Sequence, residues 1–255
     1  MKILVFDLET SPIVSYHWSL FDQNISLGQI KDDWRIIAWA AKWLGDPASK
    51  TMYMDNSKTG KVQDDKQLVV GLSKLLNEAD VIITQNGDAF DVKKLNARAI
   101  INKLPPIKSV RSIDILKEGR KVFKFTSHKL EYITGVLNDK YKKLKHAEYP
   151  GFELWSAIMK GDKRAWAVMK KYCIHDVLST EEAYTKLAPW IKTGPVTDHI
   201  GGCKCGSVRL QARGWARSVA GKYRRYQCQD CGKWLKDAVN LYKAQLKQNI
   251  MREGK

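Results

Sequence analysis

The chain opens with the stretch MKILVFDLETSP (residues 1–12), in which an apolar run is followed by two carboxylates and ended by Ser11-Pro12. Residues two apart on a β-strand point to the same side, so Asp7 and Glu9 direct their oxygens at one point. Such a pair repels unless a cation lies between its members, and Mg²⁺ prefers oxygen ligands. A lone acidic residue after a strand is more often a turn former. The interpretation of this pair as a metal site therefore depends on further acidic residues elsewhere in the chain.

A second acidic position follows in the stretch DVIITQNGDAFD (residues 80–91). This pattern predicts a short buried strand, a glycine turn and then a helix with Leu95 and Ile101 facing inward. Asp91 lies at the junction of strand and helix, where α/β sheets place their ligand crevice. The alternative is that Asp91 only caps the helix.

The third position lies in a long helical stretch that contains YCIHD (residues 172–176). Tyr172 and Asp176 are four residues apart and share one helical face. Flanking apolar residues predict that this face turns inward, and Cys173 is expected to pack in the core. We interpret Asp176 as directed toward a site rather than toward solvent.

Together FDLET (residues 6–10), NGDAFD (residues 86–91) and YCIHD (residues 172–176) resemble the three motifs of the DEDD 3′–5′ exonucleases. The Tyr-x-x-x-Asp spacing resembles the subgroup that includes the exonuclease domain of family B DNA polymerases. The His subgroup would need histidine at position 171, which is lysine. Three ordered motifs are more specific than any one of them. Intervening stretches resemble free-standing bacterial and phage relatives of that domain: SIDILK (residues 112–117), FKFTSHKL (residues 123–130) and KGDKRA (residues 160–165).

The resemblance implies an RNase H-like α/β fold with a mixed sheet flanked by helices, and a two-metal hydrolase. Asp7, Glu9 and Asp176 would hold one Mg²⁺ or Mn²⁺ ion, and Asp7 and Asp91 a second. Tyr172 would orient the attacking water, since a phenol with an ordinary pKa near 10 is a poor base at neutral pH.

Composition independently indicates a polyanionic partner. The chain has 44 Lys and Arg against 27 Asp and Glu, a net charge of +17. Such an excess favours nucleic acid. Residues 196–255 contain 13 basic and 4 acidic residues, so the C-terminal part is the more basic. No apolar run is long enough to span a bilayer, and we expect a cytoplasmic protein of a bacterium or phage-infected cell.

Four of the five cysteines follow a Gly-Pro break at residues 194–195, in the pairs Cys203-x-Cys205 and Cys228-x-x-Cys231. Each pair is followed by glycine, which indicates one structural Zn²⁺. The segment resembles the zinc ribbons of transposases and other DNA-binding proteins. The first pair is shorter than the usual Cys-x-x-Cys, so His199 remains an alternative to Cys203.

Basic residues interleaved with aromatic ones predict the nucleic-acid contacts of this segment. The predicted contacts are Arg217, Lys222, Arg224 and Arg225, with Asn86 added from the second motif. Tyr226 and Trp234 are expected to pack the ribbon. The remaining tail repeats apolar residues at intervals of three and four, which predicts an amphipathic helix.

The sequence therefore predicts an RNase H-like exonuclease domain (residues 1–193), a zinc ribbon (residues 194–236) and a C-terminal helix (residues 237–255). The expected function is hydrolysis of DNA from 3′ ends, with single strands as the favoured form. Two alternatives stay open. One is a structure-selective endonuclease or RNA nuclease on the same site, and the other is a nucleic-acid-binding protein without activity.

Overall fold

We analysed a computed structural model of the chain, which describes residues 1–58, 64–144, 148–191, 202–203, 207–218, 221–237 and 239–241. The chain forms two compact units, residues 1–193 and 194–255. Each unit is described by itself.

The first unit is built on a mixed five-stranded sheet with the strand order β5-β4-β1-β6-β7. Strand β1 is central, antiparallel to β4 and parallel to β6. A separate two-stranded ribbon is formed by β2 and β3. The strands are β1 (Ile3–Thr10), β2 (Val14–Ser15), β3 (Ile30–Asp32), β4 (Ile36–Trp43), β5 (Met52–Asp55), β6 (Val81–Thr84) and β7 (Arg111–Asp114).

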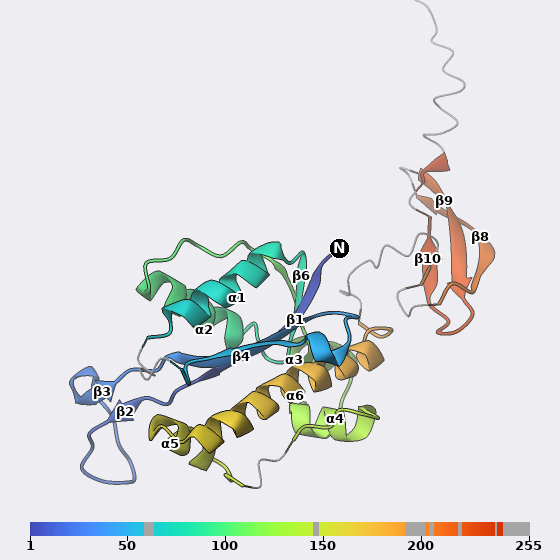
Figure 1. Cartoon of the computed structure of the whole chain (residues 1–255). Coiled ribbons are helices and arrows are strands. Elements are labelled where there is room, and N and C mark those ends of the chain that lie inside the picture. The colour runs from blue at the N-terminus through green and yellow to red at the C-terminus, as the bar shows by residue number, and fades with distance from the viewer. Residues whose placement is uncertain are drawn as a thin grey trace, which may run out of the picture. The chain divides into compact units, whose positions relative to one another are not determined.

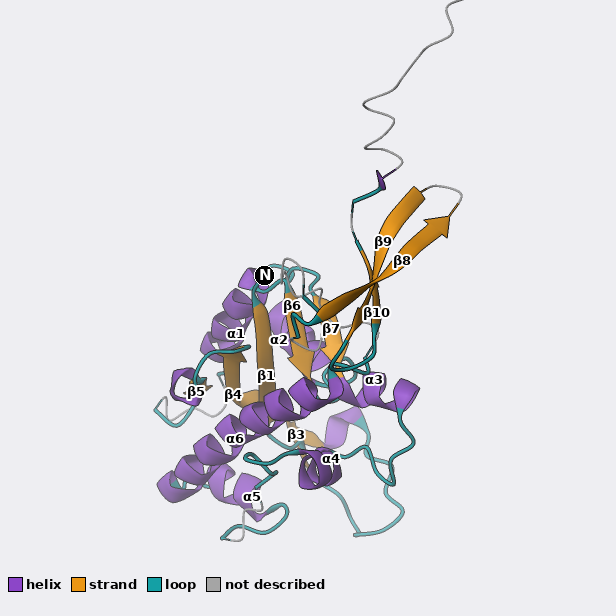
Figure 2. Ribbon diagram, turned by 90° about the vertical axis from the view of Figure 1, so that its right-hand side faces the viewer, coloured by secondary structure: helices purple, strands orange, loops and turns teal. Residues whose placement is uncertain are grey.

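Helices cover both faces of this sheet (Figures 1 and 2). On one face α1 and α2 pack against Leu4, Phe6 and Leu8 of β1. On the other face α3, α4, α5 and the long α6 pack against Ile3 and Val5. The helices are α1 (Lys66–Glu78), α2 (Asp91–Ile101), α3 (Ile115–Val122), α4 (Leu130–Leu137), α5 (Glu153–Met159) and α6 (Lys163–Leu187). The predicted mixed sheet flanked by helices is confirmed.

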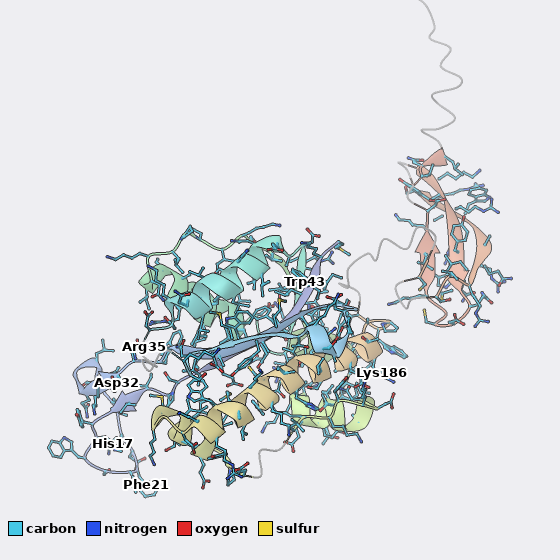
Figure 3. The ribbon with its side chains drawn as sticks, in the orientation of Figure 1. His17, Phe21, Asp32, Arg35, Trp43 and Lys186 are labelled. Atoms are coloured by element: carbon cyan, nitrogen blue, oxygen red, sulfur yellow. The ribbon has the colours of Figure 1, made fainter. Side chains whose placement is uncertain are left out.

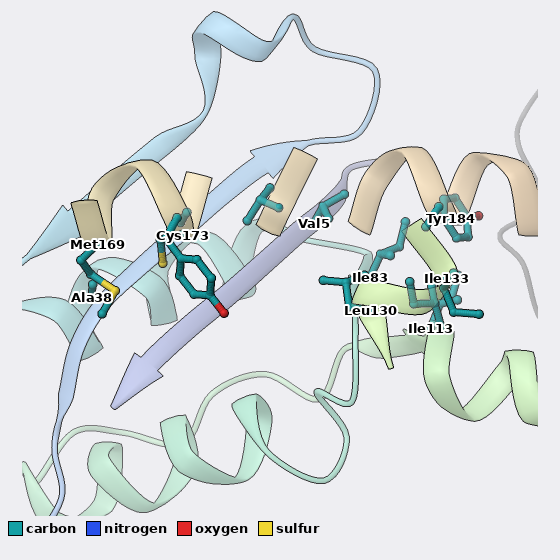
Figure 4. Close-up of a cluster of buried hydrophobic side chains, with 14 of the residues drawn as sticks. Val5, Ala38, Ile83, Ile113, Leu130, Ile133, Met169, Cys173 and Tyr184 are labelled. Atoms are coloured by element: carbon teal, nitrogen blue, oxygen red, sulfur yellow. The ribbon is translucent and has the colours of Figure 1, made fainter. Parts of the chain in front are cut away.

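Strand β4 explains how α6 comes so close to the sheet. Its residues Ala38 and Ala40 are fully buried and leave room for Met169 and Cys173 of α6, which lie over the strand in Figure 4. Cys173 is buried in the core, as predicted. Alanine methyl groups let a helix backbone approach a strand more closely than larger side chains do.

The prediction that Ile101 faces inward is wrong. Leu95 is fully buried, but Ile101 is 55% exposed at the end of α2. Six residues correspond to about 600° of helical rotation, which leaves Ile101 about 120° around the helix from Leu95 and outside its buried face. The buried face continues instead through Arg98 and Ala99.

The loop that connects β2 to β3 exposes large apolar side chains. Trp18 is 98% exposed and Leu27 86% exposed. Figure 3 labels His17 and Phe21 on this loop, away from the sheet.

The second unit contains an antiparallel three-stranded sheet with the order β10-β9-β8. Its strands are β8 (Leu210–Ser218), β9 (Gly221–Cys228) and β10 (Trp234–Lys236). Most of the predicted C-terminal helix lies outside the described residues. Within the described part of the chain, no helix combines the length and apolar character needed to cross a bilayer.

Candidate active site and metal centres

The site begins on β1, where the apolar row Ile3 and Val5 continues as Asp7 and Glu9. These four residues share the face of the strand that looks toward α6. Ala40 pairs with Asp7 and Ala38 with Glu9 on the neighbouring strand. The small partners leave space above the sheet for the two carboxylates.

Asp91 is brought to the same place by the backbone of β1. It is the first residue of α2 and is only 3% exposed. The Leu8 N–H donates a 3.0 Å hydrogen bond to its Oδ1 atom. This bond fixes Asp91 beside the residue that separates Asp7 from Glu9.

The turn before Asp91 depends on glycine. A Cβ atom at Gly87 would lie 2.2 Å from Thr84 Oγ1, closer than unbonded heavy atoms approach. Asp114 holds the same turn: its carboxylate accepts hydrogen bonds from the backbone of Asn86 at 2.8 Å and of Asp88 at 3.3 Å. Asp114 also caps α3. Asp114 was not among the predicted site residues.

Helix α6 supplies Tyr172 and Asp176, one turn apart and both buried. The Tyr172 hydroxyl is hydrogen bonded to the Asp176 carboxylate. Lys143, in the segment after α4, approaches the same carboxylate with Nζ 3.2 Å from Asp176 Oδ2. Its ammonium group also lies 5.2 Å from the centre of the Tyr172 ring. No motif or periodicity marked Lys143 in the sequence.

Three of the four carboxylates predicted from the motifs come together. One oxygen each from Asp7, Glu9 and Asp176 lies within 4.8 Å of the others. Asp91 is outside this set of three but close enough to raise the pKa of Asp7. Two buried oxygens, Asp7 Oδ2 and Asp176 Oδ1, have no hydrogen-bond partner among the residues that the structure describes. Unpaired buried carboxylate oxygens facing one point fit a divalent cation.

The electrostatics of the cluster reflect this crowding. Burial, and then the neighbouring Asp91, Glu9 and Asp176, raise the pKa of Asp7 well above its ordinary value. Burial and Asp176 raise the pKa of Glu9 to about 8. Burial raises the pKa of Asp91 to about 7, against the hydrogen bonds from Leu8 and its own backbone. Burial also raises the pKa of Asp176, opposed mainly by Lys143.

These shifts predict that magnesium stabilises the protein more at alkaline pH. Folding raises the pKa of Glu9 from 4.5 to about 8, so the folded state binds this proton more tightly than the unfolded state does, and protonation of Glu9 stabilises the fold. That contribution is complete below about pH 4.5 and is lost as the pH rises to about 8. Cation binding needs the ionised carboxylates and compensates for their repulsion.

We expect Mg²⁺ to raise the thermal unfolding temperature by about 5 °C more at about pH 9 than at about pH 6. The measurement is a thermal melt with and without Mg²⁺ at both pH values, with KCl of matched ionic strength as the control. An equal Mg²⁺ effect at the two pH values would contradict a cation site made of these carboxylates.

The second unit brings together Cys203, Cys228 and Cys231, whose Sγ atoms lie within 4.8 Å of one another. The Cys203 and Cys231 sulfurs are 3.5 Å apart. Gly232 adopts a φ of +70°, which favours glycine, and its N–H donates to the Cys228 carbonyl. Three convergent thiols fit Zn²⁺. Cys205 and His199 lie outside the described residues.

The predicted nucleic-acid contacts of the ribbon do not share one face. Lys222 and Arg224 lie over the ring of Trp215, at 4.8 and 5.5 Å from its centre. Arg225 lies over Trp234 at 3.8 Å. Arg224 and Arg225 are consecutive in β9 and therefore point to opposite faces of the sheet. They are not interchangeable contacts.

The remaining predicted contacts, Arg217 and Asn86, both have exposed side chains. Asn86 adopts a φ of +66° on the turn before Asp91. Arg217 pairs with Lys222 across β8 and β9, so the two side chains share the face that carries Trp215.

Comparison with known proteins places this arrangement in a family. No curated protein sequence matches the chain. The chain is similar in fold to the family B DNA polymerase from the hyperthermophilic archaeon Pyrobaculum calidifontis, with a TM-score of 0.53 and 16% sequence identity. The similarity covers 74% of this chain and 24% of the polymerase, so the chain spans about a quarter of that protein. Residues 44–188, which include Asp91, Tyr172 and Asp176, match the RNase H superfamily, and the chain belongs to this superfamily.

Proposed function

We propose that the protein is a metal-dependent 3′–5′ exonuclease of the DEDD type, Tyr subgroup, which hydrolyses DNA from single-stranded or frayed 3′ ends. The observation that carries the proposal is the convergence of Asp7, Glu9 and Asp176 within 4.8 Å. The unpaired oxygens of Asp7 and Asp176 support it. The 3′–5′ direction rests on the resemblance of the three motifs.

In this proposal Asp7 is the central ligand, because it belongs to the group with Glu9 and Asp176 and its pKa is also raised by Asp91. When bound, two Mg²⁺ or Mn²⁺ ions would activate water and offset charge on the phosphate. The bond from Leu8 to Asp91 holds the fourth carboxylate in place without taking up its second oxygen. The protein thus supplies a rigid set of oxygen ligands at the end of β1.

Tyr172 acts by position. Burial, Asp176 and Glu9 raise its pKa above the ordinary value, so the phenol stays protonated at neutral pH. Its hydroxyl can donate to Asp176 while its oxygen accepts from a water molecule. Tyr172 therefore orients the attacking water and does not remove its proton.

We further propose that the second unit is a zinc ribbon that recruits nucleic acid. Its described part exposes Trp215 and also Trp234, which was expected to pack the ribbon but is 50% exposed. Both rings lie beside basic side chains. Aromatic rings stack on bases, and the neighbouring Arg and Lys contact phosphates.

The proposal is tested by digesting 5′-labelled DNA and RNA strands of the same sequence with Mg²⁺ or Mn²⁺. We expect a ladder that shortens stepwise from the 3′ end, with DNA as the preferred substrate. A strand with a blocked 3′ end and a closed circle serve as controls and should persist. Internal cuts in the circle would contradict the exonuclease proposal and favour an endonuclease. A strand that is bound but not cut would indicate a nucleic-acid-binding protein without enzymatic activity.

A further inference from the structure

The first half of α6 carries an uncompensated row of basic residues on its solvent side. Between Lys163 and His175 the helix contains four Lys and Arg residues and no Asp or Glu. All four are exposed. Tyr172 and Asp176 lie on the inward side of the same helix, so the row is separate from the proposed active site.

Two hollows lie along this row. A groove of about 900 Å³ between the edge strand β5 and the start of α6 is lined by Lys58, Lys163 and Lys170, with Asp55 as the acidic residue among those that line it. A second hollow of about 580 Å³ is lined by Arg164, Lys170, Lys171 and His175, with Glu148 as its acidic residue. Lys170 and Ala167 line both hollows, so the two hollows are adjacent on the helix. We name Lys58, Lys163, Arg164, Lys170, Lys171 and His175 the basic track.

One end of the basic track reaches the carboxylates. His175 precedes Asp176 and its Nε2 atom lies 2.5 Å from the Lys142 carbonyl oxygen. The next residue, Lys143, contacts Asp176. Positive charge therefore extends from the active site, past His175, to the β5 edge.

The chemistry of the basic track suits a phosphate backbone. Arg164 has an acidic neighbour, Glu148, at 2.5 Å. For Lys58, Lys163, Lys170 and Lys171, the described residues include no ion-pair partner within 4.0 Å. Tyr53 and the buried Trp166 form the floor of the first groove, and Lys170 lies 5.8 Å from the Tyr53 ring centre. The exposed groups of the groove are therefore mainly lysines, and lysines spaced along a helix bind phosphates without regard to base sequence.

We infer that the basic track binds the phosphate backbone of the substrate strand on the 5′ side of the bond that is cut. This inference rests on the proposed exonuclease function and extends it to a substrate class, a polynucleotide strand rather than a short oligonucleotide. Twelve residues of α6 span about 18 Å. That length corresponds to about five nucleotides at the B-form rise of about 3.4 Å.

The test compares the double variant Lys170→Glu/Lys171→Glu with Lys50→Glu/Lys74→Glu, which changes the net charge equally at exposed positions away from the basic track. Binding of a labelled strand of about 20 nucleotides is measured at several salt concentrations without added Mg²⁺ or Mn²⁺, in chains of residues 1–255 that also carry Asp7→Asn, so that cleavage is too slow to affect the measurement. We expect the α6 variant to bind about tenfold more weakly. The slope of log K against log salt concentration should fall in magnitude by about 1.4, the value for two phosphate contacts on a single strand. The control should match the parent protein.

A second arm compares hydrolysis of a trinucleotide with that of the long strand, with Asp7 intact. The α6 variant should keep its activity on the trinucleotide, which reaches only the carboxylates, and lose its preference for the long strand. An unchanged dependence of binding on salt, or equal losses of activity on both substrates, would contradict the inference that the basic track binds the substrate strand. If the parent protein cleaves neither substrate but the salt slope still falls, the exonuclease proposal fails and the basic track stands as a nucleic-acid-binding surface.

Discussion

Asp7→Asn is expected to lower the rate of 3′-end removal by on the order of a thousandfold while the protein stays folded. Asp7 is the residue whose pKa responds to all three other carboxylates of the cluster. Its Oδ2 atom is buried without a partner. An amide at this position offers the cation a neutral oxygen and a nitrogen that cannot bind it. The measurement is single-turnover cleavage of a 5′-labelled strand.

The same substitution should not destabilise the metal-free protein at about pH 8, because it removes one of several repelling carboxylates. We expect an equal or higher unfolding temperature than that of the parent, and a smaller increase when Mg²⁺ is added. Asp46→Asn, in the turn after β4 at the far end of the sheet, is the matched control and should change neither activity nor the Mg²⁺ effect. Normal turnover by the Asp7→Asn protein would contradict the proposed site.

Cys228→Ser is expected to reduce the zinc content from one ion per chain to none and to unfold the three-stranded sheet of the second unit. In the described part of that unit the buried residues are Cys203, Gly221 and Cys228, so the sheet has almost no apolar core. Its folding free energy must then come largely from metal ligation, as in other small zinc modules.

Zinc content measured by mass spectrometry, together with limited proteolysis, tests this expectation. Cleavage should appear within β8 to β10 while residues 1–193 stay resistant, because the two units are separately compact. Cys173→Ala is the control: Cys173 is buried in the core of the first unit, and its replacement should leave the zinc content unchanged. An unchanged zinc content in the Cys228→Ser protein would remove this cysteine from the ligands.

The fold and the convergence of the acidic residues could be predicted because both follow from simple periods. Asp7 and Glu9 share a face by the two-residue period of a strand, and Asp176 shares one with Tyr172 by the helical turn. The same reasoning failed for Ile101. Its inward direction was inferred from Leu95, six residues earlier, and that spacing does not return to the same face of a helix. Arg224 and Arg225 were both predicted to contact nucleic acid, although consecutive residues of a strand point to opposite faces of the sheet.

Lys143 and Asp114 were missed for a different reason. Lys143 lies in a segment after α4 with no regular secondary structure, so no period predicts where its side chain points. Asp114 acts through its carboxylate, which accepts bonds from a turn 26 and 28 residues earlier in the chain. Both roles arise from tertiary contacts between segments that no local pattern connects.

Ala38 and Ala40 give β4 an influence on a site to which it contributes no functional group. They are the partners of Glu9 and Asp7, and they set how near α6 can lie to the sheet. A methyl group added to either one would lift the helix that carries Asp176 and widen the span across the carboxylates. In the proposed metal site, the radius of the cation that fits would therefore be set from the neighbouring strand, by the volume of its side chains.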